Sequence, residues 1–218
     1  ACIPIRDTRN AGDEEQNHFT AQSNRKLMCK WIFFGALLLA QVCYGQLIPV
    51  GSTWRYYDQG MAPPGQSNLT WKDLAYDDSS WGSGAAELGY GDGDESTVID
   101  PLAITGYFRF LFVADDPGDF DSLHLGLTYD DGAIVYLNGV EVWRVNMPSG
   151  PVTYNTFATS NSADNAQATV RKVNTLVSGQ NILAVEVHQH SAYSTDLSFN
   201  FTMSGIPAPG IAYIVRGP

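Results

Sequence analysis

Apolar and polar residues alternate with a period of two along much of the chain, and no stretch shows a sustained helical period. The pattern repeats in 104–113 (ITGYFRFLFV), 122–129 (SLHLGLTY) and 196–203 (DLSFNFTM). In the last of these, Leu197 and Phe199 belong to the apolar set. Such alternation is typical of strands that bury one face against a core.

Turn signals separate these runs. An Asn-Gly pair at 138–139 joins 133–137 to 140–145 and supplies the two positive-φ positions of a type I′ hairpin turn. Many short strands joined by such turns indicate a β-sandwich or barrel, and the long connections 58–103 and 146–167 favour a jelly roll. We therefore predict an all-β fold, a single-domain jelly-roll β-sandwich over 46–205, followed by a short strand-like tail.

The segment before this domain has the pattern of an export signal. Met28-Cys29-Lys30 is a short basic start, 31–40 (WIFFGALLLA) is an apolar run, and small residues precede Gln46. The run is shorter than the roughly 20 apolar residues of a membrane span. We interpret 28–45 as a cleaved signal peptide, which predicts a secreted protein, extracellular or at the cell surface, without membrane insertion after cleavage. Residues 1–27 are interpreted as upstream translated sequence, the alternative being a genuine N-terminal extension.

Composition narrows the class of protein. The chain has 218 residues, is 44% hydrophobic and carries a formal charge of −11, so it can bury a core but offers no basic surface for nucleic acid or anionic membrane. All three cysteines (Cys2, Cys29, Cys43) precede the predicted cleavage point, so no disulfide is expected in the domain.

Several stretches together resemble a family of bacterial secreted modules with a galactose-binding-domain-like jelly roll. The resemblance covers about 51–204, and such modules are accessory domains often attached to metallophosphatases or other large exoproteins. It implies that Trp81 and the Asp/Gly stretches are mainly architectural. No such partner domain is read in this sequence, which puts an enzyme-targeting role in doubt. The matching stretches are 51–58 (GSTWRYYD), 71–81 (WKDLAYDDSSW), 87–94 (ELGYGDGD), 107–109 (YFR), 130–139 (DDGAIVYLNG) and 179–189 (GQNILAVEVHQ).

Catalytic signals are weak. The stretch 81–84 (WGSG) lacks the spacing of a nucleophile elbow. His188 and His190 would share one face of a strand and could ligate a metal together, but no third ligand is placed by sequence. We predict that the protein is not an enzyme.

Acidic loops suggest a structural calcium ion. Asp92, Asp94 and Glu95 lie in a Gly-rich loop, and Asp115 and Asp116 begin a second acidic loop. Ca²⁺ takes six to eight oxygen ligands, which flexible acidic loops supply. The alternative is that these are solvated turn aspartates.

Carbohydrate binding would need exposed aromatic rings. Trp71, Tyr76 and Tyr90 are the sugar-stacking candidates, although burial in a core explains most aromatic residues equally well. Asn68-Leu-Thr and Asn200-Phe-Thr are candidate glycosylation sequons, and Asn200 is expected to point outward.

The tail suggests assembly. In 206–218 a Pro-rich linker is followed by a short apolar run, and a similar run lies at the start of the domain. Both runs either fold back as edge strands or are donated to the next copy, which would build an open homopolymer. The expected assembly residues are Ile211, Tyr213, Ile214, Val215, Leu47 and Ile48.

Two functions follow from these patterns. The first is a non-catalytic extracellular structural subunit that self-assembles into a filament or surface layer by strand donation. The alternative is a monomeric carbohydrate-binding or adhesion module whose partners are glycans.

Overall fold

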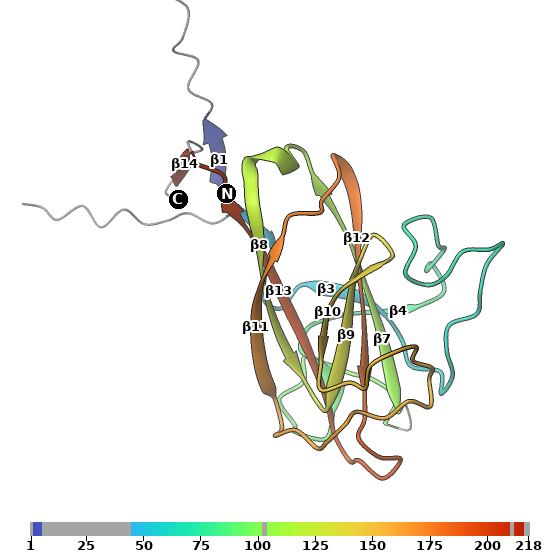
Figure 1. The fold of residues 1–218 in the computed structure, drawn as a ribbon. Helices are drawn as coiled ribbons and strands as arrows, with labels where there is room; N and C mark the ends of the chain where they lie inside the picture. The colour runs from blue at the N-terminus through green and yellow to red at the C-terminus, as the bar shows by residue number, and fades with distance from the viewer. Residues whose placement is uncertain (1, 6–44, 102–103, 210–211, 216–218) are drawn as a thin grey trace, which may run out of the picture.

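The computed structural model describes residues 2–5, 45–101, 104–209 and 212–215. Two β-sheets pack face to face in it, which confirms the predicted β-sandwich (Figure 1). The first sheet has the order β10-β9-β12-β7-β3-β4, and the second has the order β11-β8-β13-β5-β6 with β2 beside β13.

The first sheet consists of β3 (Thr53–Tyr57), β4 (Gly82–Ala85), β7 (Thr105–Ala114), β9 (Gly132–Leu137), β10 (Val140–Val145) and β12 (Gly179–His188). The second consists of β2 (Gly45–Ile48), β5 (Leu88–Tyr90), β6 (Thr97–Val98), β8 (Phe120–Tyr129), β11 (Ala166–Val173) and β13 (Leu197–Pro207). A short 3-10 helix, η1 (Pro117–Asp119), joins β7 to β8. Neighbouring strands are antiparallel except for the parallel pair β5 and β6.

The β9–β10 hairpin has the predicted turn. Asn138 and Gly139 have φ values of 51° and 83°, the positive angles that a type I′ turn requires. The Asn138 side chain accepts a hydrogen bond from the backbone N–H of Ile182 (3.0 Å) and donates one to Oδ1 of Asn181 (2.9 Å). The turn is therefore fixed to the start of β12 as well as to its own strands.

The main core lies between the sheets. On β8 the inward residues Leu123, Leu125 and Leu127 are buried, as the alternation predicts. Trp54 of β3 is fully buried, and its ring meets Phe199 of β13 edge-on with centroids 4.9 Å apart. Apolar residues of both sheets thus form one continuous core.

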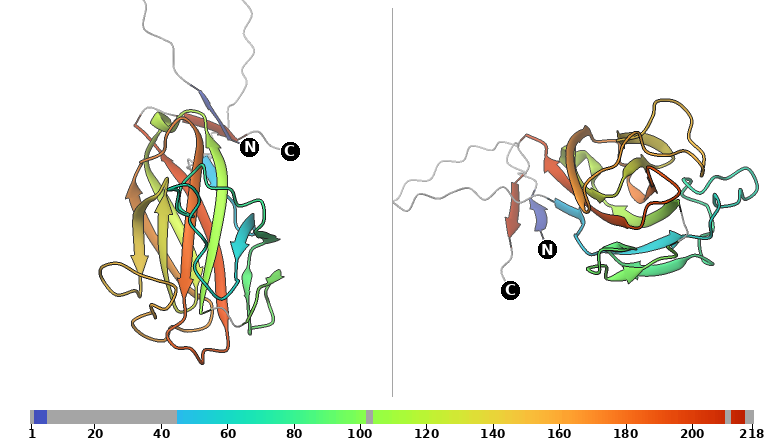
Figure 2. Two further views of the ribbon diagram at one scale, coloured as in Figure 1. Left: turned by 90° about the vertical axis from the view of Figure 1, so that its right-hand side faces the viewer. Right: turned by 90° about the horizontal axis from the view of Figure 1, so that it is seen from below.

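A second apolar cluster covers the outer face of the first sheet. Loops 58–81 and 146–165 fold over this face, and the left view of Figure 2 shows the teal loop 58–81 in front of the strands. The cluster combines loop residues with outward residues of the strands: Trp71, Tyr76, Trp81, Tyr107, Ile134, Tyr136, Met147, Ala158 and Ala184. This face of the sheet is consequently covered by loops that can shape a binding site.

The terminal strands pair within the chain. β2 lies against β13, with Ile48 fully buried in the main core and Leu47 packed against it. β14 (Ala212–Val215), which includes Tyr213, Ile214 and Val215, pairs with β1 (Cys2–Ile5). Both strands therefore have partners without a second copy.

Parts of the predicted domain organisation lie outside the described residues. These are Ile211 and most of the segments 1–27 and 28–45. β13 ends at Pro207, which pairs with Phe120 of β8, so the sheet extends two residues past the predicted domain boundary at 205. In the part of the chain that the structure describes, no helix has the length and apolar character to cross a bilayer.

Candidate functional site

A groove of about 650 Å³ opens between the first sheet and the two loops that cover it. Its size falls in the range of small-molecule binding sites. We call it the Trp71 groove. It is lined by Ala62, Trp71, Lys72, Tyr107, Tyr136, Glu141, Arg144, 149–154 and Glu186.

The floor of the groove is formed by outward-facing residues of three neighbouring strands, β7, β9 and β12. On β12 the residues Ala184, Glu186 and His188 share the outer face, opposite to the residues that point into the main core. Glu186 lies directly across from Tyr107 of β7, and Ala184 lies across from Tyr136 of β9. Two tyrosines and one carboxylate from three adjacent strands thus meet at one place.

Arg109 of β7 attaches the first loop to the sheet. Its side chain is 2% exposed and forms an ion pair with Asp78, at 2.7 Å from Nε to Oδ2. The guanidinium also donates to the carbonyl oxygens of Trp71, Asp73 (3.0 Å) and Tyr76 (3.3 Å). The N–H groups of the Arg109 guanidinium thus hold the loop backbone that carries the Trp71 ring in place.

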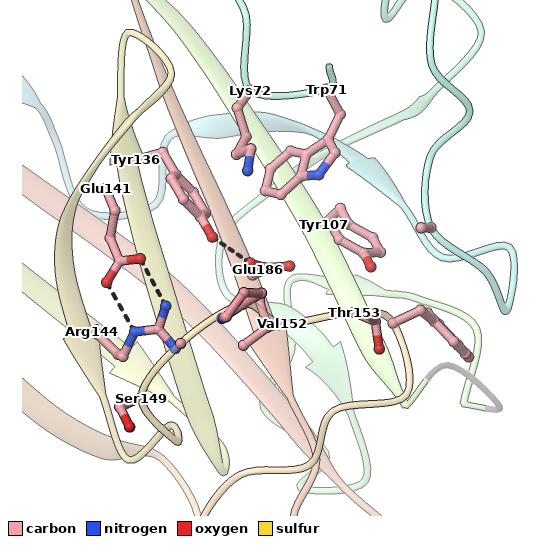
Figure 3. A pocket seen from close by; sticks show the side chains of 14 residues that line it. Trp71, Lys72, Tyr107, Tyr136, Glu141, Arg144, Ser149, Val152, Thr153 and Glu186 are labelled. Carbon is pink, nitrogen blue, oxygen red and sulfur yellow. Dashed lines mark hydrogen bonds and ion pairs between the residues drawn. The ribbon is translucent and has the colours of Figure 1, made fainter.

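The Trp71 ring stands over the two tyrosines. Its centroid is 4.9 Å from that of Tyr107 and 5.7 Å from that of Tyr136, both in edge-to-face geometry. The ammonium of Lys72 lies 4.4 Å from the Tyr136 ring centroid, and Figure 3 shows it directed into the groove. The groove therefore has one aromatic wall with a cation at its edge.

A buried polar network lies below these rings. The hydroxyl of Tyr136 donates to Oε1 of Glu186 at 2.6 Å (Figure 3). Oε2 of Glu186 lies 3.4 Å from Nε2 of the fully buried His188. Burial raises the pKa of Tyr136, and of Tyr107 beside it, and the Glu186 charge raises both further. Both phenols are therefore neutral hydrogen-bonding groups at physiological pH.

The opposite wall carries an ion pair on β10. Arg144 donates from Nε and Nη2 to the two carboxylate oxygens of Glu141, at 2.9 and 2.8 Å. This hydrogen bonding lowers the pKa of Glu141. The pair thus presents a fixed polar edge across from the aromatic wall.

Of the three predicted stacking residues, only Trp71 lines the groove. Tyr76 is buried in the second cluster, where its hydroxyl donates to the carbonyl of Pro64, and Tyr90 is buried in the main core. Neither of these two lines the groove, and Trp71, which does, is itself 8% exposed. Sequence reasoning missed Tyr107, Tyr136 and Glu186, although a glutamate within the apolar run 182–187 (ILAVEV) is a signal that could have indicated the site.

Carboxylates gather in a second cluster at one end of the sandwich. Two groups each bring ligand atoms within 4.8 Å of one another, Glu87 with Asp92 and Asp94, and Asp92 with Asp164 and Asp196. We call these five residues the carboxylate cluster. Burial and neighbouring acidic groups raise the pKa of Glu87, and burial and Asp164 raise that of Asp196.

Two further aspartates adjoin this cluster on the β8–β9 turn. Asp131 accepts hydrogen bonds from the backbone N–H of Ser162 and from both the backbone N–H and Nδ1 of His190. Burial raises the pKa of its neighbour Asp130 to about 8. Three carboxyl groups at this end of the molecule, those of Glu87, Asp130 and Asp196, therefore have raised pKa values.

The predicted calcium residues divide between two places. Asp92 and Asp94 belong to the carboxylate cluster, whereas the Glu95 carboxylate accepts the backbone N–H groups of Asp92 and Gly93, both at 3.0 Å. Asp115 and Asp116 precede β8, while Asp130 follows it, so the length of that strand separates them from the cluster. The two acidic loops do not form one site.

The other candidate residues lie away from the groove. Asn68 is exposed in a turn, and Asn200 is half-buried on β13, where its Oδ1 accepts a hydrogen bond from the Gly51 backbone at 3.4 Å. His188 is buried, and the Nδ1 of the half-buried His190 lies 2.7 Å from Asp131, so the two histidines have separate carboxylate partners.

Neither a protein-family model nor a curated protein sequence matches this chain. Among solved structures it is similar to a β-glucuronidase from glycoside hydrolase family 2, at 17% identity and a TM-score of 0.43, over 74% of this chain and 17% of that one. It is also similar to an uncultured Clostridium sp. β-glucuronidase, at 14% identity and a TM-score of 0.47, over 74% of this chain and 29% of that one. A β-D-mannosidase from Dictyoglomus thermophilum is similar at 15% identity and a TM-score of 0.36, over 65% of this chain and 15% of that one. The chain spans less than a third of each of these proteins.

Proposed function

We propose that the protein is a non-catalytic carbohydrate-binding module, of the galactose-binding-like kind, and that the Trp71 groove is its ligand site. The observation that carries this proposal is the arrangement of one aromatic wall, Trp71 with Tyr107 and Tyr136, across from the fixed polar edge of Glu141 and Arg144. Sugar rings present an apolar face and a rim of hydroxyl groups, and this groove offers complements to both.

Binding is tested by screening the purified full chain on a glycan array and measuring the affinity for each hit by calorimetry. Replacing Trp71 with Ala should weaken binding at least tenfold, since it removes the top of the aromatic wall. The matched control is Trp143→Ala, which changes a tryptophan of β10 outside the groove lining. If no glycan binds, or if Trp71→Ala binds as well as the unaltered chain, the proposal is wrong.

The pairing of the terminal strands supports this module over a self-assembling subunit. Strand donation needs a strand that lacks a partner and a sheet with a vacant position. β2 meets neither requirement because it lies on its own sheet, and β14 is paired with β1 as long as the residues before Gln46 are retained.

A calcium ion held by the carboxylate cluster is the cofactor that we propose. Supporting it are the two carboxylate triads that share Asp92, and Oε1 of Glu87, which is buried without a hydrogen-bond partner. Hard oxygen ligands of this kind suit Ca²⁺. The ion would be structural, because it would tie the β5–β6 loop to 161–165 and to the start of β13.

Calcium binding is tested by isothermal titration of chelator-treated protein with CaCl₂, together with thermal unfolding. Calcium at one hundred times its Kd should stabilise the fold by about 2.7 kcal/mol. Asp92→Asn should abolish the effect, whereas Asp115→Asn, at the far end of β8, should retain it. A melting temperature that does not respond to calcium would exclude a structural ion.

We also propose that the module acts outside the cell. The basic start and apolar run before Gln46 support export, and N-terminal sequencing of protein from the culture medium tests it. A chain that stays inside the cell, with residues before Gln46 retained, would contradict export.

A further inference from the structure

The charged groups of the Trp71 groove differ in how they are paired. The lining contains four formal charges, on Lys72, Glu141, Arg144 and Glu186. Arg144 and Glu141 neutralise each other through two hydrogen bonds, at 2.9 and 2.8 Å. The charge that a ligand meets therefore depends on Glu186 and Lys72.

Glu186 faces His188 behind the floor of the groove. The Nδ1 atom of His188 lies 2.7 Å from the carbonyl oxygen of Thr156, which only accepts, so Nδ1 carries a hydrogen. The other ring nitrogen, Nε2, makes no hydrogen bond and lies 3.4 Å from Oε2 of Glu186. Without a proton between them, a nitrogen lone pair would face a carboxylate inside the protein. Glu186 therefore has its ion-pair partner in His188, behind the floor of the groove.

Lys72 makes no hydrogen-bonded ion pair, although the charges of Asp73 and Glu141 interact with it from a greater distance. Its Nζ atom makes no ion pair with any residue that the structure describes, and its closest aromatic contact is the Tyr136 ring at 4.4 Å. Of the two cations that line the groove, Arg144 is held by Glu141, and Lys72 is the one without an ion pair among the described residues, in a chain whose formal charge is −11. At physiological ionic strength charges beyond about 8 Å are largely screened, so the acidic surface elsewhere does not cancel this local charge.

We propose that the groove selects acidic saccharides and that the Lys72 ammonium binds the anionic substituent, a carboxylate or a sulfate. The inference rests on the proposed function, because it names the class of sugar for the same groove. The aromatic wall would hold the ring while Lys72 contributes the specificity. A neutral sugar would leave the ammonium without an anionic partner.

The experiment uses the full chain and a glycan panel in which each acidic oligosaccharide is paired with its neutral form. Uronic acids are paired with their methyl esters, and sulfated sugars with the unsulfated sugars. Affinities are measured by calorimetry at 150 mM NaCl. We expect the acidic member to bind about tenfold more tightly, the size of one charge-assisted hydrogen bond. The two sets of pairs show whether carboxylate or sulfate is preferred.

The variant Lys72→Met keeps the aliphatic stem over Tyr136 and removes the charge. It should reduce the acidic preference to within about twofold, whereas Lys172→Met on β11 should preserve the preference. Equal binding of acidic and neutral members, or a preference that survives in Lys72→Met, overturns this inference but leaves the carbohydrate-binding proposal intact. If no saccharide binds, the proposed function itself fails.

Discussion

Glu186 is the residue on which the floor of the Trp71 groove depends. It is 4% exposed and lies within the otherwise apolar run 182–187, where a leucine or valine would pack without a polar partner. One carboxylate oxygen accepts a hydrogen bond from the Tyr136 hydroxyl, and the other lies 3.4 Å from Nε2 of His188. A buried carboxylate is tolerated at this place because Tyr136 and His188 are polar groups that face its two oxygens.

Replacing Tyr136 with Phe tests this matching. The change keeps the ring but removes the hydroxyl that donates to Glu186, so a buried oxygen loses its partner. We expect the free energy of unfolding to fall by about 1–3 kcal/mol in urea denaturation. Tyr193→Phe is the control, because Tyr193 is 91% exposed and should change nothing measurable. Equal stability of the two variants would contradict the role given to the Tyr136 hydroxyl.

Asp130 predicts an unusual dependence of stability on pH. Its pKa is raised from 3.8 to about 8 in the folded protein, so between these values the folded state holds a proton that the unfolded state has lost. Stability is then greatest below pH 4 for this group and falls as the pH rises towards 8. The slope is at most about 1.4 kcal/mol per pH unit, and less where solvent screens the group.

Urea unfolding with EDTA at pH 5, 6, 7 and 8 measures this slope. Asp130→Asn should flatten it, leaving a smaller slope of the same sign from Glu87 and Asp196, whose pKa values are also raised. A stability that rises over this range in the unaltered protein would show that Asp130 ionises normally.

At the scale of elements, Arg109 connects loop 58–81 to strand β7. Arg109→Met removes the ion pair with Asp78 and the donors to three backbone carbonyls. Breaking a buried pair of this kind costs about 3–5 kcal/mol, and the displaced loop should also abolish ligand binding. The measurements are urea unfolding and calorimetry.

The control for Arg109 is Arg171→Met. Arg171 pairs with Asp121 on the surface, where the two side chains are 59% and 53% exposed. Such pairs contribute about 0–1 kcal/mol, so this variant should remain close to the unaltered chain. If both variants lose stability equally, Arg109 does not attach the loop.

How well the buried residues of a strand can be predicted from the sequence depends on whether one or both of its faces are covered. In 122–129 only one face meets a core, so alternation alone identified the inward leucines Leu123, Leu125 and Leu127. In 105–109 both faces are covered, because loops fold over the outer residues Tyr107 and Arg109, whereas Leu111 and Val113 further along the strand are exposed. A period of two indicates which residues share a face but not whether a distant loop covers it.

The candidate site was less predictable for a related reason. Trp71 was identified as a large aromatic residue in a long loop, but its partners Tyr107, Tyr136 and Glu186 come from three strands. Their meeting depends on the register between β7, β9 and β12, which hydrophobic pattern within one strand does not specify.

At the scale of the whole molecule, the arrangement of the tail predicts a monomer. Deleting 209–218 removes β14, whose described pairing is with β1 alone, and keeps the bond from the Ala208 N–H to the Asp119 carbonyl. We expect the same elution volume and light-scattering mass, and unfolding within about 0.5 kcal/mol of the full chain. Large oligomers that form only with the tail present would instead support assembly through strand donation.

The sheet order also determines when this protein can fold. β12 lies between β9 and β7 at the centre of one sheet, and β13 lies between β8 and β5 at the centre of the other, yet both are encoded within 179–207. Until that stretch has been synthesised, β9 and β7 lack the strand that joins them, and so do β8 and β5. The last contacts to form, such as those between β2 and β13, join residues that are far apart in the sequence. A nascent chain that still lacks 179–207 therefore has no stable sandwich, because the central strand of each sheet is missing.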